Sequence, residues 1–261
     1  MSKQFARVYV SVANIYSNPS YQSEVVTQVL LNEKMEVKNS DNHFSLVKLR
    51  DGYEGWISNY QWVTDSGQDD NKKKIRSHFV RIYDSPEENR RCLRDATIGT
   101  NLRILDTKNN WSQVILPDGV KGWVESSHFR SFPPASREGV IELANEFIGY
   151  PYYWGGRSVK GFDCSGLIQT IFALVGIPLP RDAWMQYRDG NEINCEMKDG
   201  PAGDLYFFGE QGTKITHVGL AIGNGDLIHA RGMVRRNSLI EGRANYSQEL
   251  VKTFIGIKSF F

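Results

Sequence analysis

The first half of the chain alternates apolar and polar residues over short segments, which Gly, Asp and Asn interrupt at close intervals. Alternation with a period of two is typical of half-buried strands, because successive side chains of a strand point to opposite faces. Short strands with turn residues between them favour small β-barrels. The pattern therefore predicts all-β structure for residues 1–131.

This half also contains an internal repeat, in which each landmark recurs 67 positions later. The matching pairs are Ile15-Tyr16 with Ile82-Tyr83, Pro19 with Pro86, Asp51-Gly52 with Asp118-Gly119, and Gly55-Trp56 with Gly122-Trp123. Each copy has roughly 60 residues, near the lower limit for an independent core. We predict two barrels, residues 1–66 and 72–131, and interpret the charged run Asp69-Asp70-Asn71-Lys72-Lys73-Lys74 as a solvated linker.

From residue 136 onward the spacing of apolar residues becomes helical. It predicts a helix over 137–148 with Ser136 as its N-cap, and a second helix from Cys164 to the residue before Gly176. Strand candidates follow at 204–208, 217–222, 227–230 and 251–257, with a hairpin turn at 223–226. Helices followed by antiparallel strands predict an α+β domain at residues 136–261.

The composition is that of an ordinary globular protein, with 261 residues, 40% hydrophobic, 23% charged and a net charge of +1. This balance favours neither nucleic acid nor an anionic membrane as a partner. No apolar run reaches the roughly 20 residues of a transmembrane helix. The first residues lack the apolar core of a secretory signal. We therefore expect a cytoplasmic monomer that does not bind membranes or nucleic acid.

The three cysteines, Cys92, Cys164 and Cys195, are odd in number and widely spaced, which favours neither a disulfide framework nor structural zinc. Cys164 opens the second predicted helix. A helix N-terminus lowers the pKa of a thiol, so we expect a thiolate nucleophile there. His217 is the candidate general base, with Gly219 leaving space beside it, and His229 would orient it.

Taken singly, these residues also have ordinary explanations. A cysteine on a helix is often a small buried apolar residue, and a histidine is often part of the surface or of a satisfied core. A Cys/His/His zinc site is a further alternative, although the three residues lack close ligand spacing. Their joint occurrence in this order favours a nucleophile, a base and an orienter.

The second half resembles the NlpC and p60 family of cell-wall cysteine peptidases through six motifs that occur in the family's order. They are Tyr152-Tyr153-Trp154-Gly155-Gly156, Phe162-Asp163-Cys164-Ser165-Gly166-Leu167, Leu179-Pro180-Arg181-Asp182, Gly203-Asp204-Leu205-Tyr206-Phe207-Phe208, Thr216-His217-Val218-Gly219 and Ile228-His229-Ala230. The resemblance implies a papain-like core, a Cys164, His217 and His229 triad, and Tyr152 near the thiol or the oxyanion. It implies no metal and no organic cofactor.

The repeated barrels resemble bacterial SH3 domains in Ile15-Tyr16-Ser17-Asn18-Pro19 and Gly55-Trp56-Ile57 and their second copies. SH3 domains ahead of this catalytic domain are similar to those of γ-D-glutamyl-L-diamino-acid endopeptidases, also called dipeptidyl-peptidase VI. That resemblance implies a murein stem peptide with a free N-terminal L-alanine as the substrate. The bond after γ-D-glutamate would be cut. The first residues, which lack the apolar core of a signal, favour recycling of cell-wall peptides as the setting.

The same resemblance implies that Asp182 and Tyr53 hold the substrate's amine, to which we add Glu24. The repeat supports this division, because Val120 replaces Tyr53 and Arg91 replaces Glu24 in the second copy. Asp163 and Ser165, which flank the thiol, are also predicted to bind substrate. Many relatives have serine after the acid, whereas this chain has Ala183, so part of the substrate recognition differs.

Several alternatives stay open. Tyr53 could be an ordinary strand tyrosine, and Asp182 could cap the helix-like segment that starts at Ala183. The barrels could bind murein beside a vestigial catalytic domain, or the same core could act as an amidase or acyltransferase. The sequence does not specify whether the diamino acid is lysine or diaminopimelate.

Overall fold

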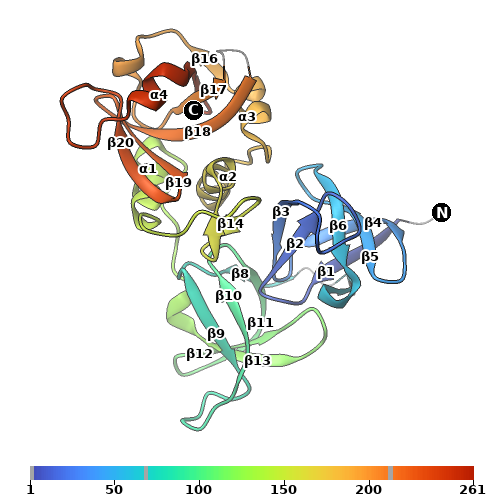
Figure 1. The fold of residues 1–261 in the computed structure, drawn as a ribbon. Helices are drawn as coiled ribbons and strands as arrows, with labels where there is room; N and C mark the ends of the chain where they lie inside the picture. Colours follow the sequence, from blue (N-terminus) through green and yellow to red (C-terminus); the bar gives the residue numbers. More distant parts are fainter. Residues whose placement is uncertain (1–2, 68–69, 211–213) are drawn as a thin grey trace. The chain divides into compact units, whose positions relative to one another are not determined.

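The computed structural model describes residues 3–67, 70–210 and 214–261. The chain forms two compact units, residues 1–131 and 132–261 (Figure 1). The first unit is built from strands and short 3-10 turns, and the second combines helices with a sheet. The predicted fold class, an α+β catalytic domain preceded by two small all-β barrels, is confirmed.

The first sheet of the N-terminal unit has seven strands, all paired antiparallel, in the order β3-β2-β6-β5-β4-β1-β7. They are β1 (Gln4–Val8), β2 (Val12–Tyr16), β3 (Val25–Leu30), β4 (Lys34–Ser40), β5 (Phe44–Lys48), β6 (Glu54–Ser58) and β7 (Trp62–Thr64), with the 3-10 turn η1 (Asn59–Gln61) before β7. Their inward-facing residues, among them Ile15, Val47 and Ile57, form one apolar core.

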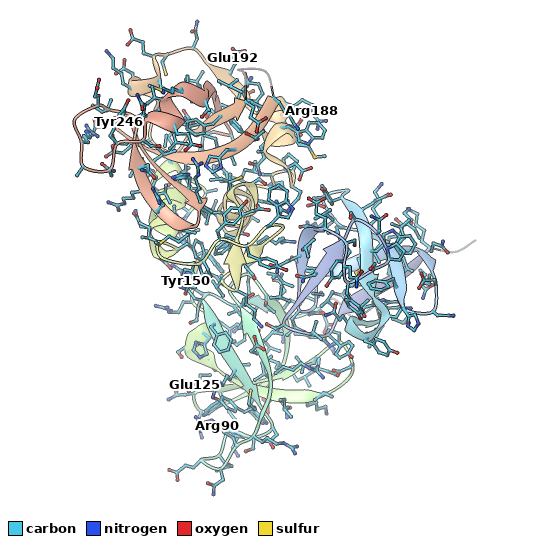
Figure 2. All side chains as sticks on the ribbon, viewed as in Figure 1. Arg90, Glu125, Tyr150, Arg188, Glu192 and Tyr246 are labelled. Carbon is cyan, nitrogen blue, oxygen red and sulfur yellow. The ribbon has the colours of Figure 1, made fainter. Side chains whose placement is uncertain are left out.

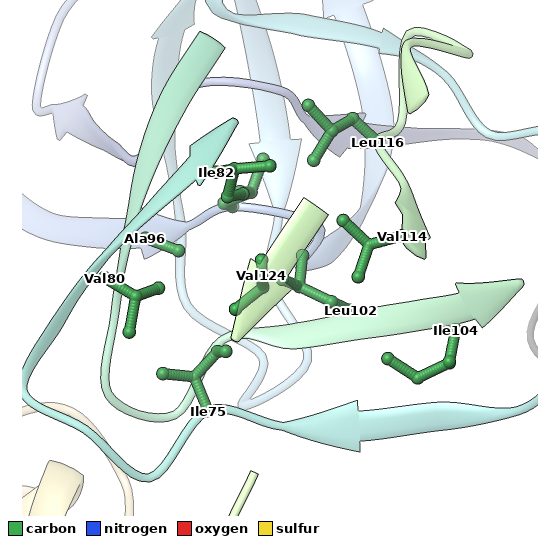
Figure 3. Packing of buried hydrophobic residues seen from close by; sticks show 10 residues of the cluster. Ile75, Val80, Ile82, Ala96, Leu102, Ile104, Val114, Leu116 and Val124 are labelled. Carbon is green, nitrogen blue, oxygen red and sulfur yellow. The ribbon is translucent and has the colours of Figure 1, made fainter. Parts of the chain in front are cut away.

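The second sheet repeats this plan in the order β10-β9-β13-β12-β11-β8. Its strands are β8 (Lys72–Lys74), β9 (Phe79–Tyr83), β10 (Cys92–Thr97), β11 (Asn101–Lys108), β12 (Trp111–Ile115) and β13 (Lys121–Glu125), and η2 (Ser126–His128) follows Glu125, labelled in Figure 2. Figure 3 shows Ile82, Val114 and Val124 within its core. These three are the repeat partners of Ile15, Val47 and Ile57, so the two copies bury the same positions.

The glycine of each Gly-Trp pair is required by packing. A Cβ atom at Gly55 would lie 2.5 Å from Ile15 Cγ2, and one at Gly122 would lie 2.5 Å from Ile82 Cγ2. Carbon atoms at that distance overlap, because their optimal separation is about 3.5–4.0 Å. The repeated Gly-Trp landmark is therefore a signature of how the barrel closes.

The interpretation of Lys72-Lys73-Lys74 as part of a solvated linker is wrong. These residues form β8, which pairs with β11 at one edge of the second sheet, whereas Asp69 lies outside the described residues. Lysine suits an edge strand, because its charge discourages another chain from pairing there while its methylene groups cover apolar surface. A charged sequence can therefore be a strand when it lies at the edge of a sheet.

The second unit carries its helices against one six-stranded antiparallel sheet in the order β16-β21-β17-β18-β19-β20. Its helices are α1 (Arg137–Glu146), α2 (Cys164–Leu174), α3 (Ala183–Asp189) and α4 (Gln248–Thr253), with the 3-10 turn η3 (Met197–Asp199). The sheet contains β16 (Asn191–Ile193), β17 (Leu205–Glu210), β18 (Lys214–Gly223), β19 (Asp226–Arg231), β20 (Met233–Ser238) and β21 (Phe254–Ser259), and β14 (Arg157–Ser158) pairs separately with β15 (Gly161–Phe162).

Most of the elements predicted in this unit are present, and one is wrong in part. Ser136 caps α1 by accepting a hydrogen bond from Gly139 N, as predicted. The turn between β18 and β19 has positive φ at Asn224 and Gly225, which matches the twist of a hairpin. The predicted strand 251–257 instead begins as α4, because the Ser247 side chain caps that helix, and only β21 is a strand.

We expect Gly122→Ala to lower the free energy of unfolding by about 1–3 kcal/mol, the usual effect of overpacking a core. The new methyl group would overlap Ile82 Cγ2. Urea unfolding of the full chain measures the change, and Val120→Ala, at an exposed position nearby, is the matched control. Equal stability of Gly122→Ala and the native chain would contradict this account of the repeat.

Candidate active site

The local sequence places Cys164 at the first position of α2. Asp163 is the N-cap, with an extended backbone, and its carboxylate accepts a hydrogen bond of 2.6 Å from Gly166 N. This bond satisfies one of the backbone donors that a helix start leaves without an intrahelical partner. The extended segment of β15 therefore gives way to a helix at the thiol, as the sequence predicts.

A buried ion pair holds this helix start in place. Arg181 is 2% exposed, and its guanidinium donates to both Asp163 oxygens, at 3.1 and 2.5 Å. Arg181 also donates to Ser165 Oγ at 2.9 Å. Two parallel bonds between a guanidinium and a carboxylate fix direction as well as distance. The loop before α3 is therefore tied to the residues on both sides of the nucleophile.

Glycines allow a second segment to lie against the same helix start. A Cβ atom at Gly166 would come 2.1 Å from the carbonyl oxygen of Gly156, and that oxygen accepts a hydrogen bond from Asp163 N at 3.0 Å. Gly155 N donates to the Asp163 carboxylate at 2.9 Å. The two glycines after Trp154 thus bring Tyr152 and its neighbours to the thiol.

The two candidate histidines lie on paired strands, His217 on β18 and His229 on β19. His217 Nε2 and His229 Nδ1 are 2.7 Å apart. His229 Nε2 lies 2.9 Å from Oδ1 of Asn237 on β20. The three side chains form a continuous line of hydrogen bonds across three neighbouring strands, and Nδ1 of His217 lies at its outer end.

Gly219 leaves space for the hydrogen-bonded side chains, but this space does not lie beside His217, where we expected it. A Cβ atom at position 219 would lie 3.1 Å from the Cβ of His229 and 2.7 Å from Leu227 Cδ1. The space is therefore filled by Leu227 and His229, not by His217. His229 is 1% exposed, so its ring has little freedom to avoid such a contact.

Helix α2, which begins at Cys164, packs against β18, the strand that carries His217. The Cys164 thiol interacts with the backbone N–H of Val218, the residue that follows His217, and with the N–H of Ser165. Burial, and then the charges of Cys164 and Asp163, raise the pKa of the Tyr152 phenol to about 12. Tyr152 is therefore a neutral O–H group within electrostatic range of Cys164.

Burial decides the protonation of these groups. Burial, and then the charge of Asp163, raise the pKa of Cys164 to about 12. Burial lowers the pKa of His229 to about 4 and that of His217 well below its usual value. The expected lowered pKa of the thiol is wrong for the free protein, because burial and the N-cap carboxylate outweigh the helix N-terminus. The thiol and both rings are neutral at pH 7.

The residues predicted to bind substrate lie in different surroundings. Asp163 and Ser165 are 7% and 6% exposed, and their side chains bond to each other and to Arg181 inside the unit. Asp182 occupies the N-cap position of α3, as the capping alternative held, but its carboxylate accepts no capping hydrogen bond from the described residues of that helix. Tyr53 packs against the core of the first barrel, and Glu24 is exposed there. The substrate roles of all five stay predictions.

The sequence analysis missed Asn237 and the anchoring role of Arg181. Arg181 belongs to a quoted motif, but nothing in a single sequence shows which carboxylate it meets. Asn237 lies on β20, in a charged segment with no clear alternation. Its signal would have been a polar residue on the strand next to His229, which requires the register of the sheet.

All three cysteines are free. Among the described residues, no group of three or more His, Cys, Asp or Glu side chains is placed to hold a metal ion. Within the same residues, no helix has both the length and the apolar character needed to cross a membrane.

A thiol at a helix start that packs against the strand of one imidazole, with a second imidazole 2.7 Å from the first, is an arrangement typical of nucleophilic catalysis by cysteine. Comparison with known proteins identifies the family. The NlpC/P60 family model matches residues 149–253, the bacterial SH3 domain model residues 11–61, and a bacterial dipeptidyl-peptidase Sh3 domain model residues 82–129.

Similar proteins include two named γ-D-glutamyl-L-lysine dipeptidyl-peptidase. The one from Bacillus cereus is 30% identical over 80% of this chain and 68% of its own length, and the one from Bacillus subtilis is 32% identical over 79% and 72%. The crystal structure of an NlpC/P60 family protein from Bacillus cereus, 24% identical, has the same fold with a TM-score of 0.85 over 98% of this chain and 99% of that one. The chain belongs to the NlpC/P60 family of cysteine peptidases.

Acidification should destabilise the protein between pH 6.5 and 4 through His229. The unfolded chain binds a proton at His229 below its ordinary pKa of 6.5, whereas the folded chain binds it only near 4. Stability is therefore present above pH 6.5 and is lost as the pH falls, by about 3 kcal/mol for this group. Urea unfolding across this range measures the loss, and His229→Gln should remove the share of His229 while that of His217, whose pKa burial also lowers, remains. Asp65, with a pKa of about 2, contributes its own loss at lower pH. An equally steep loss in His229→Gln would contradict the assignment.

Arg181→Met should lower the free energy of unfolding by about 3–5 kcal/mol, because it leaves a buried carboxylate without its cation. The double variant Arg181→Met with Asp163→Asn should recover part of this loss, since the charge is then removed as well. Urea unfolding of the two variants measures the recovery. If the double variant is no more stable than Arg181→Met, the ion pair is not what Arg181 contributes.

Proposed function

We propose that the protein hydrolyses the γ-D-glutamyl bond to the diamino acid in murein peptides that carry a free N-terminal L-alanine. The similarity of 30% and 32% to two γ-D-glutamyl-L-lysine dipeptidyl-peptidases, over about four-fifths of the chain, carries the proposal. The Cys164 thiol, which interacts with the N–H of Val218, and the hydrogen-bonded pair of His217 and His229 would supply the chemistry. The match of the second barrel to a dipeptidyl-peptidase Sh3 model adds support.

The neutral site implies that proton transfer accompanies the attack. The Cys164 sulfur attacks the γ-glutamyl carbonyl carbon while its proton moves to Nδ1 of His217. The N–H of Cys164 has no intrahelical partner at its position in α2, and the pKa of Tyr152 responds to the charge of Cys164, so we propose both as donors to the oxyanion. One such donor contributes about 3–4 kcal/mol.

The intermediate then collapses with the proton passing from His217 to the leaving amine of the diamino acid. The remaining thioester joins Cys164 to the γ-carbonyl of L-Ala-D-Glu. Water attacks this thioester as His217 accepts its proton, and the sulfur leaves and is reprotonated. Every proton passes through one ring nitrogen, so the reaction depends on His217 keeping Nδ1 free.

Recognition of the free amine is part of the proposal. An ammonium group removed from water needs a compensating charge, because leaving it unpaired costs several kcal/mol. The Asp182 carboxylate, one residue from Arg181 and at the start of α3, has the charge that this role needs. We propose Tyr53 and Glu24 as its partners from the first barrel. The contrast with Val120 and Arg91 in the second copy supports this choice.

We also propose that the protein acts as a monomer in the cytoplasm, in the recycling of murein peptides. A site that selects a free amine acts on released peptides rather than on stems whose amine is held in an amide bond. Lysine in the names of the relatives favours lysine as the diamino acid. Recycling thus follows from the amine requirement, which the experiment below measures directly.

The test uses L-Ala-γ-D-Glu-L-Lys and its diaminopimelate counterpart, each with a free or an acetylated amino end. We expect the native protein to release L-Ala-D-Glu from the free peptides, as measured by mass spectrometry. Cys164→Ala should abolish release, and Cys195→Ala, at an exposed cysteine, should retain it. Asp182→Asn should lower kcat/KM on free peptides at least tenfold, about 1.4 kcal/mol.

Each rival makes a different prediction in this experiment. A murein-binding protein with a vestigial catalytic domain would release nothing while still sedimenting with purified murein. An amidase or acyltransferase would act on blocked and free peptides at similar rates. Release that survives in Cys164→Ala would refute the nucleophile, and equal cleavage of acetylated peptides would refute the amine site.

A further inference from the structure

Asn237 ends the line of hydrogen bonds that begins at the catalytic histidine. In the register of β19 and β20, His229 lies opposite Arg235 and Leu227 lies opposite Asn237. Positions 235 and 237 share one face of β20, because side chains alternate along a strand. Asn237 is 5% exposed and its Oδ1 lies 2.9 Å from His229 Nε2. It is therefore a buried diagonal neighbour of His229.

Two further bonds determine which way the Asn237 amide points. Its Nδ2 donates to the backbone carbonyl of Asn245 at 2.9 Å, and its Oδ1 accepts from Arg235 Nε at 3.0 Å. A flipped amide would place an N–H group against the arginine N–H and an oxygen against the carbonyl, so both bonds would become repulsive. The oxygen of Asn237 therefore faces His229.

The segment that supplies the Asn245 carbonyl is itself held to β20. The same carbonyl accepts a second hydrogen bond from Ser238 N at 2.9 Å. The next residue, Tyr246, labelled in Figure 2, forms a bridge with Ser238. Ser247 then caps α4. The amide of Asn237 is thus oriented by backbone on one side and by a guanidinium on the other.

The orientation of this amide determines the proton positions along the whole line. Oδ1 carries no hydrogen, so His229 Nε2 must carry one, and a neutral imidazole has only one N–H. Nδ1 of His229 is then an acceptor, so His217 Nε2 must donate to it across 2.7 Å. Nδ1 of His217 is left with a lone pair. That atom is the one the reaction requires as a base.

We propose that Asn237 is a positioning residue that fixes the tautomers of His229 and His217, and that Arg235 and the Asn245 carbonyl hold it in the required orientation. The inference rests on the thiol hydrolysis proposed above. An amide supplies direction without a charge, so His229 stays neutral beside His217. A second proton on His229 would occupy its Nδ1. His217 would then have to accept at Nε2 and carry its own proton on Nδ1, so Nδ1 could no longer act as the base.

The charged groups around the pair agree with this role. Arg231 and Arg235 both lower the pKa of His229, while the Asn237 hydrogen bond raises it and burial dominates. Burial, and then His229 and Arg231, lower the pKa of His217. From α2, Cys164 faces the strand that carries His217 and is itself neutral. Cations and burial thus keep the rings unprotonated, and Asn237 supplies the direction of the hydrogen bonds.

Nitrogen-15 NMR of the full chain labelled at histidine tests the tautomers directly. Protonated and unprotonated ring nitrogens have distinct shifts, and His217→Gln and His229→Gln assign the two rings. We expect both rings to carry their proton on Nε2 at pH 7. A proton on Nδ1 of either ring in the native protein would overturn the proposal, whether or not any peptide is cut.

Two variants test the consequence for the reaction. Asn237→Leu keeps a similar volume but removes the acceptor, so His229 should populate both tautomers and kcat should fall at least tenfold with KM unchanged. Asn237→Asp keeps the acceptor and adds a charge. It should therefore retain the tautomer and move the acid limb of kcat/KM to higher pH by about one unit or more.

Arg236→Ala is the matched control, because Arg236 lies on β20 between these residues and bonds to Asn145 of α1. It should retain the native kcat and pH profile. If Asn237→Leu cuts peptides at the native rate, or if Asn237→Asp leaves the acid limb in place, Asn237 has only a structural role. That result would leave the proposed peptidase activity intact, so the two failures are distinguishable.

Discussion

The catalytic unit depends on the carboxylate of Asp163. It caps α2 through Gly166 N, accepts a second backbone bond from Gly155 and pairs with Arg181. Three stretches of chain therefore converge on one buried anion, and the thiol lies one residue away. The ion pair by itself is weak evidence for stability, because desolvation costs roughly what the attraction returns. The pair fixes the position of the start of α2. Removing either partner would leave an uncompensated buried charge.

The same carboxylate explains why the thiol is not acidic at rest. The positive end of a helix favours a nearby anion, but here the N-cap already provides one. Burial raises the pKa of Cys164, and Asp163 raises it further. Because burial also keeps the imidazoles neutral, charge separates only when a substrate carbonyl is present to receive the electrons. The protein thus joins a dry, neutral resting site to a directed line of hydrogen bonds.

The sequence predicts local features well where one pattern dominates. The repeat, the start of α2 and the hairpin between β18 and β19 rest on glycine, capping and alternation, all of which act over a few residues. Leu250 and Val251 suit a strand and a helix equally, and the Ser247 cap decided the outcome. β20 has charged residues on both faces, so neither it nor Asn237 could be found without the register.

The pKa values of the thiol and of the two imidazoles were harder to predict from the sequence. A helix start next to a cysteine indicates a lowered pKa only if the site stays partly wet and the cap is uncharged. Both conditions depend on what packs around residue 164, which is set by segments as distant as Arg181 and β18. Tertiary packing thus overrode a sound local expectation.

The hairpin turn at Asn224 and Gly225 is followed by only a short stretch of β19 before His229. Because a strand reverses its face with every residue, one amino acid inserted into that stretch would send the imidazole to the wrong side of the sheet, whereas two would restore its side. Only insertions or deletions of an even number of residues in this stretch therefore keep His229 on its side of the sheet. Descendants of this gene should gain or lose codons here in pairs if they are to keep a working enzyme.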